Sequence, residues 1–389
     1  MLTVNYITRP WFFDISVEFI REFKKLVNLN VIIIISPENA GYLGISKTDA
    51  QTYLDKTLKL EDVLKGDMRD RLNPYFEGAN VLCKFEQHKE SSYKNALGWL
   101  KLLNKYPLLK ADLNIVETLS LADWYLLFRL KSKNIYYIIH DPQPHTGESR
   151  GRVEVINKLY FPYIHKFITY SEFSAGLFRQ YYPAYADKVI SFKMPVFTSQ
   201  KVEATTKPKS GNKKIVFFGR ISPYKGVELF YDAAAQISKT NLDVNFVVAG
   251  KAQDDYRPAF LGNNPYPNIQ IRNHFIDLEE LSEIMSDADL CVLPYFDATQ
   301  SGVIMTCYAF NLPVLVSDCP GLLEYCFDTD AFSFKNKDMD SLVRKMENLI
   351  ADDTLLHKNR QQIAGYAAQN VSLINSNLLL SDLSGAEIT

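Results

Sequence analysis

Short apolar runs alternate with segments whose apolar residues recur at helical spacing, from the N-terminus to about residue 192. Leu2–Ile7 is a short, mostly apolar run, Ile15–Val27 carries apolar residues every three to four positions, and Val31–Ser36 reads VIIIIS. This order predicts a strand, a helix and a second strand. The alternation continues, and we expect strands at Asn80–Phe85, Leu113–Thr118, Ile135–His140, Lys166–Tyr170 and Val189–Phe192, with helices at Ser91–Tyr106 and Leu121–Lys131. Such a pattern is typical of a mostly parallel sheet covered by helices on both faces.

The pattern stops between Pro195 and Lys214, where the chain is polar and lysine-rich. That composition is typical of an interdomain linker or a mobile loop. A fresh cycle follows, with strands expected at Lys214–Gly219, Val244–Ala249, Ile269–Phe275 and Asp289–Pro294, and helices at Val227–Lys239, Leu278–Met285 and Val303–Phe310. We therefore expect two doubly wound α/β domains, 1–195 and 196–365, and a tail of residues 366–389.

Composition supports this organisation and excludes some functions. A chain of 389 residues with 47% hydrophobic content can bury two ordinary cores. A net charge of −2 argues against a nucleic-acid partner bound through bulk charge. The five cysteines form no C-x-x-C pair, which indicates reduced thiols in a cytosolic protein. No secretory leader and no bilayer-length apolar run is visible, so we expect a cytoplasmic protein.

Aromatic residues, 13% of the chain, gather in three clusters, Arg9–Phe13, Leu159–Tyr163 and Arg179–Tyr185. Two interpretations are open, since such clusters belong either to an ordinary core or to a membrane interface. The second would bring the protein to the inner face of a membrane as a peripheral protein.

The stretch Leu293–Gly321 is the first candidate for a functional site. A strand end is followed by the polar run Asp297–Ser301 and then by an apolar helix, so that Ser301 falls at a helix N-cap. The N–H groups at Ser301 and Gly302 would face an anion, and the glycine would let it approach the backbone. The alternative is an ordinary strand-turn-helix unit with a serine cap.

The second candidate is Phe217–Gly226, which reads FFGRISPYKG. Arg220 directly follows a strand-ending glycine, and Lys225 precedes a helix-opening glycine. Ligands of open parallel sheets bind beyond the carboxyl ends of the strands, so both cations would project into the same crevice as Ser301. Two cations and a helix N-terminus suit a diphosphate. The alternative has Arg220 and Lys225 as solvated loop charges.

With G-R-x-x-x-x-K-G at Gly219–Gly226, a strand ending in Ala249-Gly250 and P-V-L at Pro313–Leu315, the sequence resembles retaining glycosyltransferases of family 4, glycosyl transferases group 1. The resemblance covers Lys214 to about Ile350 well and the N-terminal half loosely. It implies the GT-B fold, in which two Rossmann-like domains face across a cleft and the last helix returns to the N-terminal domain. It also implies that Arg220, Lys225, Ser301 and Gly302 bind the donor diphosphate.

The resemblance further places His274 and Phe275 beside the nucleobase. The two glutamates usual in the family are absent in register. Asp297 lies about one residue from the first and would contact the donor sugar, while Thr306 occupies the second position and would contact the ribose. A shifted loop and a different donor explain this departure equally well. The family's usual glycine-rich turn after the first strand is also replaced, by Thr8-Arg9-Pro10-Trp11.

In the N-terminal half, His140 closes an apolar strand before the turn DPQPHTGE. Parallel sheets present functional side chains at this end, and the resemblance gives His140 a place facing the donor sugar. His145 and Glu148 are acceptor-side candidates, one of them a base; a turn held by local hydrogen bonds is the alternative.

We therefore expect transfer of a hexose from a nucleotide sugar, UDP-linked, to an acceptor hydroxyl with retention. By analogy with the family, the acceptor would be a glycan or lipid-linked glycan in surface polysaccharide synthesis. No residues have metal-ligand spacing, so we expect no metal or other cofactor. Two alternatives stay open: a nucleotide-sugar epimerase of the same fold, and a noncatalytic nucleotide-sugar-binding partner of another transferase.

Overall fold

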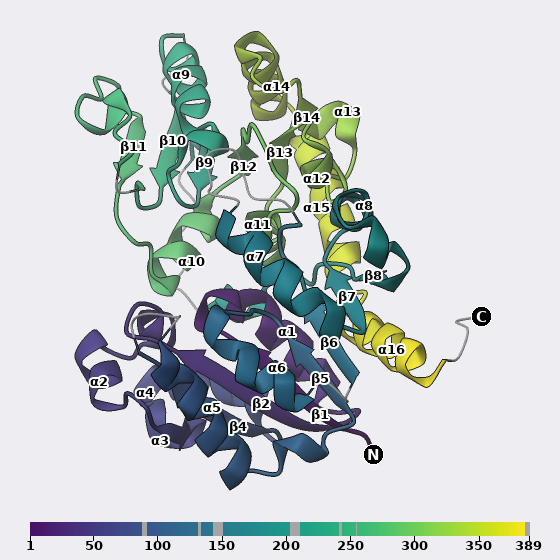
Figure 1. The fold of residues 1–389 in the computed structure, drawn as a ribbon. Helices are drawn as coiled ribbons and strands as arrows, with labels where there is room; N and C mark the ends of the chain where they lie inside the picture. The colour runs from purple at the N-terminus through teal and green to yellow at the C-terminus, as the bar shows by residue number, and fades with distance from the viewer. Residues whose placement is uncertain are drawn as a thin grey trace. The chain divides into compact units, whose positions relative to one another are not determined.

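The computed structural model describes residues 1–87, 92–130, 134–142, 151–202, 211–240, 243–253 and 255–385. The chain divides into two compact units: unit 1 is Met1–Met194 together with the segment from Val371 onward, and unit 2 is Pro195–Asn370. Each unit contains one sheet with helices on both faces (Figure 1). The prediction of two Rossmann-like α/β domains is confirmed. The domain boundary expected at residue 366 falls inside a helix, and the chain rejoins unit 1 at Val371.

Unit 1 is built on an eight-stranded sheet in the order β3-β4-β2-β1-β5-β6-β7-β8. All neighbouring strands are parallel except the edge pair of β3 and β4. The strands are β1 Thr3–Thr8, β2 Asn28–Ile35, β3 Thr57–Lys59, β4 Asn80–Phe85, β5 Leu113–Val116, β6 Asn134–Ile138, β7 Lys166–Thr169 and β8 Val189–Ser191. The helices are α1 Phe13–Phe23, α2 Lys47–Thr52, α3 Leu60–Val63, α4 Gly66–Phe76, α5 Tyr93–Lys105, α6 Trp124–Leu130, α7 Gly151–Tyr160, α8 Glu172–Tyr181 and α16 Val371–Ser384.

Helices cover both faces of this sheet, which explains why its strands are apolar almost throughout. Five consecutive residues of β2, from Val31 to Ile35, are fully buried. On one face, Trp99 of α5 and Phe178 of α8 belong to a large apolar cluster with residues of β1, β2 and β5. The other face carries α1, which packs against α4 and α16.

Unit 2 is built on a six-stranded parallel sheet in the order β11-β10-β9-β12-β13-β14. The strands are β9 Lys213–Phe218, β10 Val244–Ala249, β11 Ile269–Arg272, β12 Leu290–Leu293, β13 Val314–Ser317 and β14 Ser333–Phe334. The helices are α9 Val227–Ser238, α10 Leu278–Asp287, α11 Gly302–Ala309, α12 Pro320–Leu323, α13 Thr329–Phe332, α14 Met339–Ala351 and α15 Asp353–Ala367. The first strand of the unit, β9, lies in the middle of the sheet: β10 and β11 are added on one side of it, and β12, β13 and β14 on the other.

The three aromatic clusters each divide between core and surface. In the second cluster, Tyr160 and Phe161 are buried in the apolar core of unit 1, whereas Leu159 and Tyr163 are exposed. Trp11 and Tyr181, from the other two clusters, are also exposed. Core packing therefore accounts for part of each cluster. Within the described residues, no helix combines the length and apolarity required to cross a bilayer.

Candidate functional site

The turn after β9 and the turn after β12 lie against each other in unit 2. Gly226 has φ +61°, and a Cβ there would lie 2.0 Å from the carbonyl oxygen of Pro294. The backbone N–H of Phe296 donates to the carbonyl oxygen of Tyr224 at 2.7 Å. A left-handed backbone and so close an approach both require glycine. The two stretches singled out from the sequence, one ending at Gly226 and the other containing Ser301, thus form one site at the carboxyl edge of the sheet.

Tyr295, which sequence reasoning missed, joins the two stretches. Lys225 Nζ donates to the Tyr295 hydroxyl at 3.1 Å and lies 4.7 Å from the centre of the Tyr295 ring. The same hydroxyl is hydrogen-bonded with the Ser301 side chain. One buried hydroxyl therefore connects the predicted cation with the predicted helix cap.

The charge of Lys225 is sensitive to its surroundings. Burial lowers its pKa to about 8, and the neighbouring Arg220 guanidinium acts in the same direction. Arg220 itself is exposed, and its Nη2 donates to the Tyr224 hydroxyl at 3.3 Å. Two cations held close together, one of them partly desolvated, favour a doubly charged anion between them.

Helix α11 starts where the sequence predicts, with Ser301 as its N-cap residue. The Ser301 side chain makes no capping hydrogen bond to the helix, since it is directed to Tyr295. The structure adds a second reason for glycine at position 302. A Cβ at Gly302 would lie 2.9 Å from the Phe197 ring, so the glycine also makes room for Phe197, and the approach of an anion stays a prediction.

Thr306 is buried inside α11. Its hydroxyl donates to Gln200 Oε1 at 2.6 Å and also lies 3.2 Å from the carbonyl oxygen of Gly302. A contact of Thr306 with a ribose therefore stays a prediction that requires Gln200 to move.

His274 and Phe275 lie beyond the sheet, because β11 ends at Arg272 rather than at Phe275 as expected. His274 Nε2 is 2.8 Å from Glu280 Oε2 at the start of α10. Phe275 is 66% exposed. An exposed ring held in a loop next to a paired imidazole has the form of a stacking surface for a planar group.

Asp297 lies in the turn between β12 and α11. Burial mainly raises the pKa of the Cys319 thiol and the Asp297 carboxylate adds to that rise, so the two side chains are neighbours. The turn is held in place by its surroundings: Ser317 Oγ donates to the Tyr295 carbonyl oxygen at 2.5 Å, and Asn336 Nδ2 donates to that of Phe296 at 3.0 Å.

In unit 1, His140 follows β6 and is paired with Glu117, a residue that sequence reasoning missed. His140 Nε2 lies 3.2 Å from Glu117 Oε1, and the ring stacks on Phe12 at 4.0 Å between centroids. Glu117 is fully buried, and its other oxygen accepts hydrogen bonds from Thr8 and Ser16. Glu117 directly follows β5, which ends at Val116, whereas the expected strand Leu113–Thr118 extended past it and so did not mark it as a strand-end residue.

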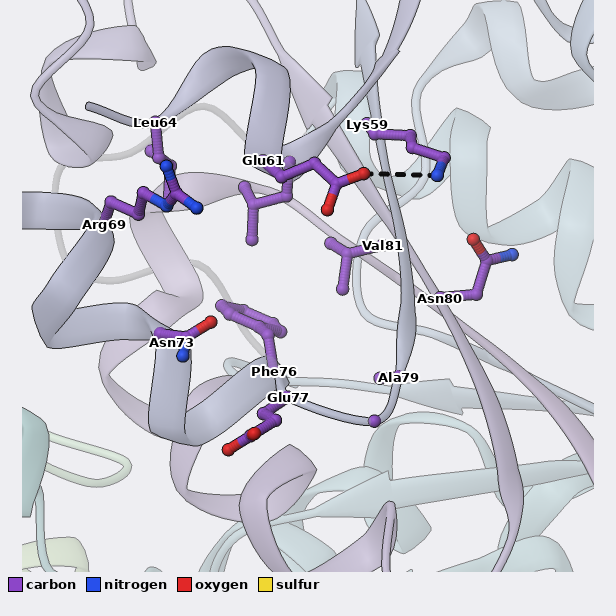
Figure 2. Close-up of a pocket in the computed structure, with 12 residues that line it drawn as sticks. Lys59, Glu61, Leu64, Arg69, Asn73, Phe76, Glu77, Ala79, Asn80 and Val81 are labelled. Carbon is purple, nitrogen blue, oxygen red and sulfur yellow. Dashed lines mark hydrogen bonds and ion pairs between the residues drawn. The ribbon is translucent and has the colours of Figure 1, made fainter.

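Two cavities lie in unit 1, one of them at His140 and Glu117. One of about 220 Å³ is lined by His140, Glu117, Phe12, Asn157 and Tyr182 among others. The other, of about 240 Å³, lies between α4 and the amino end of β4. Figure 2 shows its polar rim, where Lys59 and Glu61 pair with each other at 3.2 Å. None of the predicted site residues lines this second cavity.

The acceptor-side candidates His145 and Glu148 lie outside the described residues. Among the residues that are described, no three His, Cys, Asp or Glu side chains gather in a way that would hold a metal ion.

Comparisons with known proteins relate unit 2 to one enzyme family. Residues 212–352 match the family described as Glycosyl transferases group 1. The chain is 26% identical over 165 residues to an alpha-D-kanosaminyltransferase of Streptomyces kanamyceticus, a match that spans 41% of this chain and 42% of that relative.

Solved structures share the fold over the whole chain. Anabaena HepE, solved in complex with UDP and glucose, matches with a TM-score of 0.66 at 13% identity over 99% of this chain and 100% of its own. A putative UDP-N-acetylglucosamine 2-epimerase from Listeria monocytogenes matches with a TM-score of 0.60 at 10% identity, over 99% of this chain and 96% of its own. At such identities the likeness concerns the fold, which does not by itself assign an activity.

Proposed function

We propose that this protein is a glycosyltransferase that moves a hexose from a UDP-linked sugar to an acceptor hydroxyl with retention at the anomeric carbon. The observation that carries the proposal is the group formed by Arg220, Lys225 and Ser301 at the carboxyl edge of the unit 2 sheet. The match of this region to glycosyl transferases group 1 supports it. So do the kanosaminyltransferase relative and the UDP and glucose bound to a protein of the same fold.

In the proposed reaction, Arg220 and Lys225 bind the two phosphates of the donor, and the N–H groups at Ser301 and Gly302 assist. The bond between the anomeric carbon and the diphosphate oxygen breaks, and the acceptor oxygen bonds to the same face of that carbon. The acceptor proton passes to the leaving diphosphate. The two cations stabilise the charge that develops on the leaving group, and we propose that they do so without a metal.

We propose that the other predicted residues contact the base, the donor sugar and the acceptor. We propose that His274 and Phe275 flank the base, with Phe275 offering its exposed ring for stacking. Asp297 would contact the donor sugar, and His140 would face that sugar from unit 1. His145 and Glu148 stay proposals for the acceptor side.

The setting is proposed by analogy with the family: synthesis of a surface glycan, on a glycan or lipid-linked glycan acceptor, in the cytoplasm near the inner face of the membrane. The exposed side chains of Leu159, Tyr163 and Tyr181 support a peripheral contact. Cosedimentation with anionic vesicles tests it: the wild-type protein should bind, and replacing these three residues by serine should reduce the bound fraction.

Release of UDP from a panel of UDP-sugars, measured with and without candidate acceptors, tests the proposed activity. A transferase releases UDP in proportion to glycosylated acceptor. Isomerisation of the sugar without any acceptor would instead identify the epimerase that the shared fold also allows. Tight nucleotide-sugar binding without turnover would favour the noncatalytic alternative.

A further inference from the structure

The hydroxyl of Tyr295 lies between the two turns of unit 2 that carry the proposed diphosphate-binding residues. Tyr295 is 2% exposed, yet its hydroxyl meets two groups that come from different turns. Lys225 Nζ is 3.1 Å away, and the Ser301 side chain is hydrogen-bonded with the same hydroxyl. The Tyr295 oxygen accepts from Lys225 and also lies beside the Ser301 side chain, so one hydroxyl joins groups from both turns.

The backbone of Tyr295 is fixed, so its ring has a defined position. Its carbonyl oxygen accepts hydrogen bonds from Ser317 Oγ at 2.5 Å and from Cys319 Sγ at 3.2 Å. The following residue, Phe296, donates its N–H to the Tyr224 carbonyl oxygen at 2.7 Å, within the turn that carries Lys225. These three hydrogen bonds fix the backbone at Tyr295 and Phe296. A buried ring on a fixed backbone can hold the flexible lysine side chain in one place.

The position of Tyr295 matters because the surroundings of Lys225 disfavour its protonated form. Burial and the charge of Arg220 both favour its neutral form. The Tyr295 hydroxyl oxygen accepts a hydrogen bond from the ammonium group at 3.1 Å, which favours the charged form. A Cβ at Gly219 would lie 3.1 Å from the same nitrogen, so the glycine leaves room for the ammonium group.

We propose that Tyr295 is a positioning residue of the diphosphate site: its ring and hydroxyl hold Lys225 as an oriented cation and couple it to Ser301 at the start of α11. This inference rests on the proposed function, which supplies the diphosphate. Tyr295 acts through Lys225 and Ser301.

Tyr295→Phe tests the inference, because it removes the hydroxyl and keeps the ring. UDP binding is measured by calorimetry from pH 7 to about 9.5, a range in which the terminal phosphate, with a pKa near 6, stays ionised. In unit 2 the pKa of Lys225 is lowered by burial and by Arg220 and raised by Cys291. Tyr295 accepts a hydrogen bond from the same ammonium group. We expect UDP affinity to fall about 3- to 10-fold, the loss typical of one hydrogen bond. We also expect the decline with rising pH to begin at a lower pH than in the wild type.

Tyr231→Phe is the matched control, because it removes a hydroxyl that donates to Asn264 Oδ1 at 3.0 Å, away from the two turns. Its UDP affinity and pH profile should equal those of the wild type. If Tyr295→Phe is too unstable to purify, Ser301→Ala takes its place and should change both quantities in the same direction.

The outcomes separate this inference from the function on which it rests. Wild-type affinity and wild-type pH dependence in Tyr295→Phe, or in its replacement Ser301→Ala, would overturn the role of Tyr295 and leave the transferase proposal standing. Absence of UDP binding by the wild-type protein would overturn both.

Discussion

At the scale of single residues, the site depends on charges that are partly withdrawn from water. Lys225 loses its proton more readily than an ordinary lysine, because burial and Arg220 lower its pKa to about 8. An anion bound beside it would favour the ammonium form again. Glu117 in unit 1 is fully buried and has the imidazole of His140 next to it. The first pair, Lys225 and Arg220, predicts how UDP binding depends on pH. The second pair, Glu117 and His140, predicts how kcat depends on the charge of Glu117.

Binding of UDP should depend on pH through Lys225, whose pKa is about 8. Below that pH the lysine is already charged and binding takes up no proton at this group; above it the lysine must first be protonated, so affinity should fall as pH rises. The fall approaches tenfold per pH unit until the pKa of the complex is reached. Calorimetry in two buffers of different ionisation enthalpy, at a pH of about 8.5, should reveal proton uptake by the wild type. Affinity that stays constant across the same alkaline range would contradict this account of Lys225.

Glu117→Gln should lower kcat and leave UDP affinity nearly unchanged, because the carboxylate orients His140 in unit 1 while the diphosphate site lies in unit 2. His140 Nε2 and Glu117 Oε1 lie 3.2 Å apart, and loss of the negative charge beside the imidazole should lower the rate by about tenfold, which corresponds to about 1.4 kcal/mol. Glu18→Gln is the control, since Glu18 is a buried carboxylate of α1 paired with Arg21 at 3.1 Å. An unchanged kcat in Glu117→Gln would show that the pairing with His140 has no part in the reaction.

At the scale of elements, the sequence predicts best where a strand is buried on both faces. β4 and β10 have the predicted bounds, because a short, mostly apolar run bounded by polar residues favours a buried strand. Residues 40–76 form short helices and the edge strand β3, and none of them carries a clear apolar period. Helix α4 even contains Pro74, and we made no prediction there. The resemblance predicted that the last helix returns to the N-terminal domain, and α16 does lie in unit 1. Its place there depends on partners far away in sequence, such as Lys193, whose backbone N–H and carbonyl both bond to the Asn375 side chain.

The contact between the two turns of unit 2 should tolerate no side chain at Gly226. Gly226→Ala would force a Cβ toward the Pro294 carbonyl oxygen and keep φ at +61°. We expect a loss of at least about 2 kcal/mol in the free energy of unfolding, together with weaker UDP binding. Denaturant unfolding measures the first quantity.

Gly365→Ala is the opposite case. Gly365 lies in α15, and a Cβ added there would have nothing within 4 Å. The alanine should stabilise the protein by about 0.5–1 kcal/mol, because it favours the helix. Equal stability of both glycine variants would contradict the close approach at Gly226.

At the scale of the whole molecule, the order of elements was sufficient to predict two Rossmann-like domains, whereas the site was predicted only in part. Arg220, Lys225 and Ser301 could be found because each stands next to a strand end or a helix start. Tyr295 and Glu117 were missed because their importance lies in contacts with residues remote in sequence, Lys225 in one case and Thr8 in the other. The fold itself does not separate a transferase from an epimerase, since proteins described as each share it. The activity has to be argued from the site.

The diphosphate site is the central claim, and titration calorimetry with UDP and with GDP, without metal, tests it most directly. The wild-type protein should bind UDP in the micromolar range and prefer it to GDP. The double variant Arg220→Ala with Lys225→Ala should lose this binding while its unfolding transition stays close to that of the wild type. UDP binding that survives in the double variant, or no binding of either nucleotide by the wild type, would contradict the account.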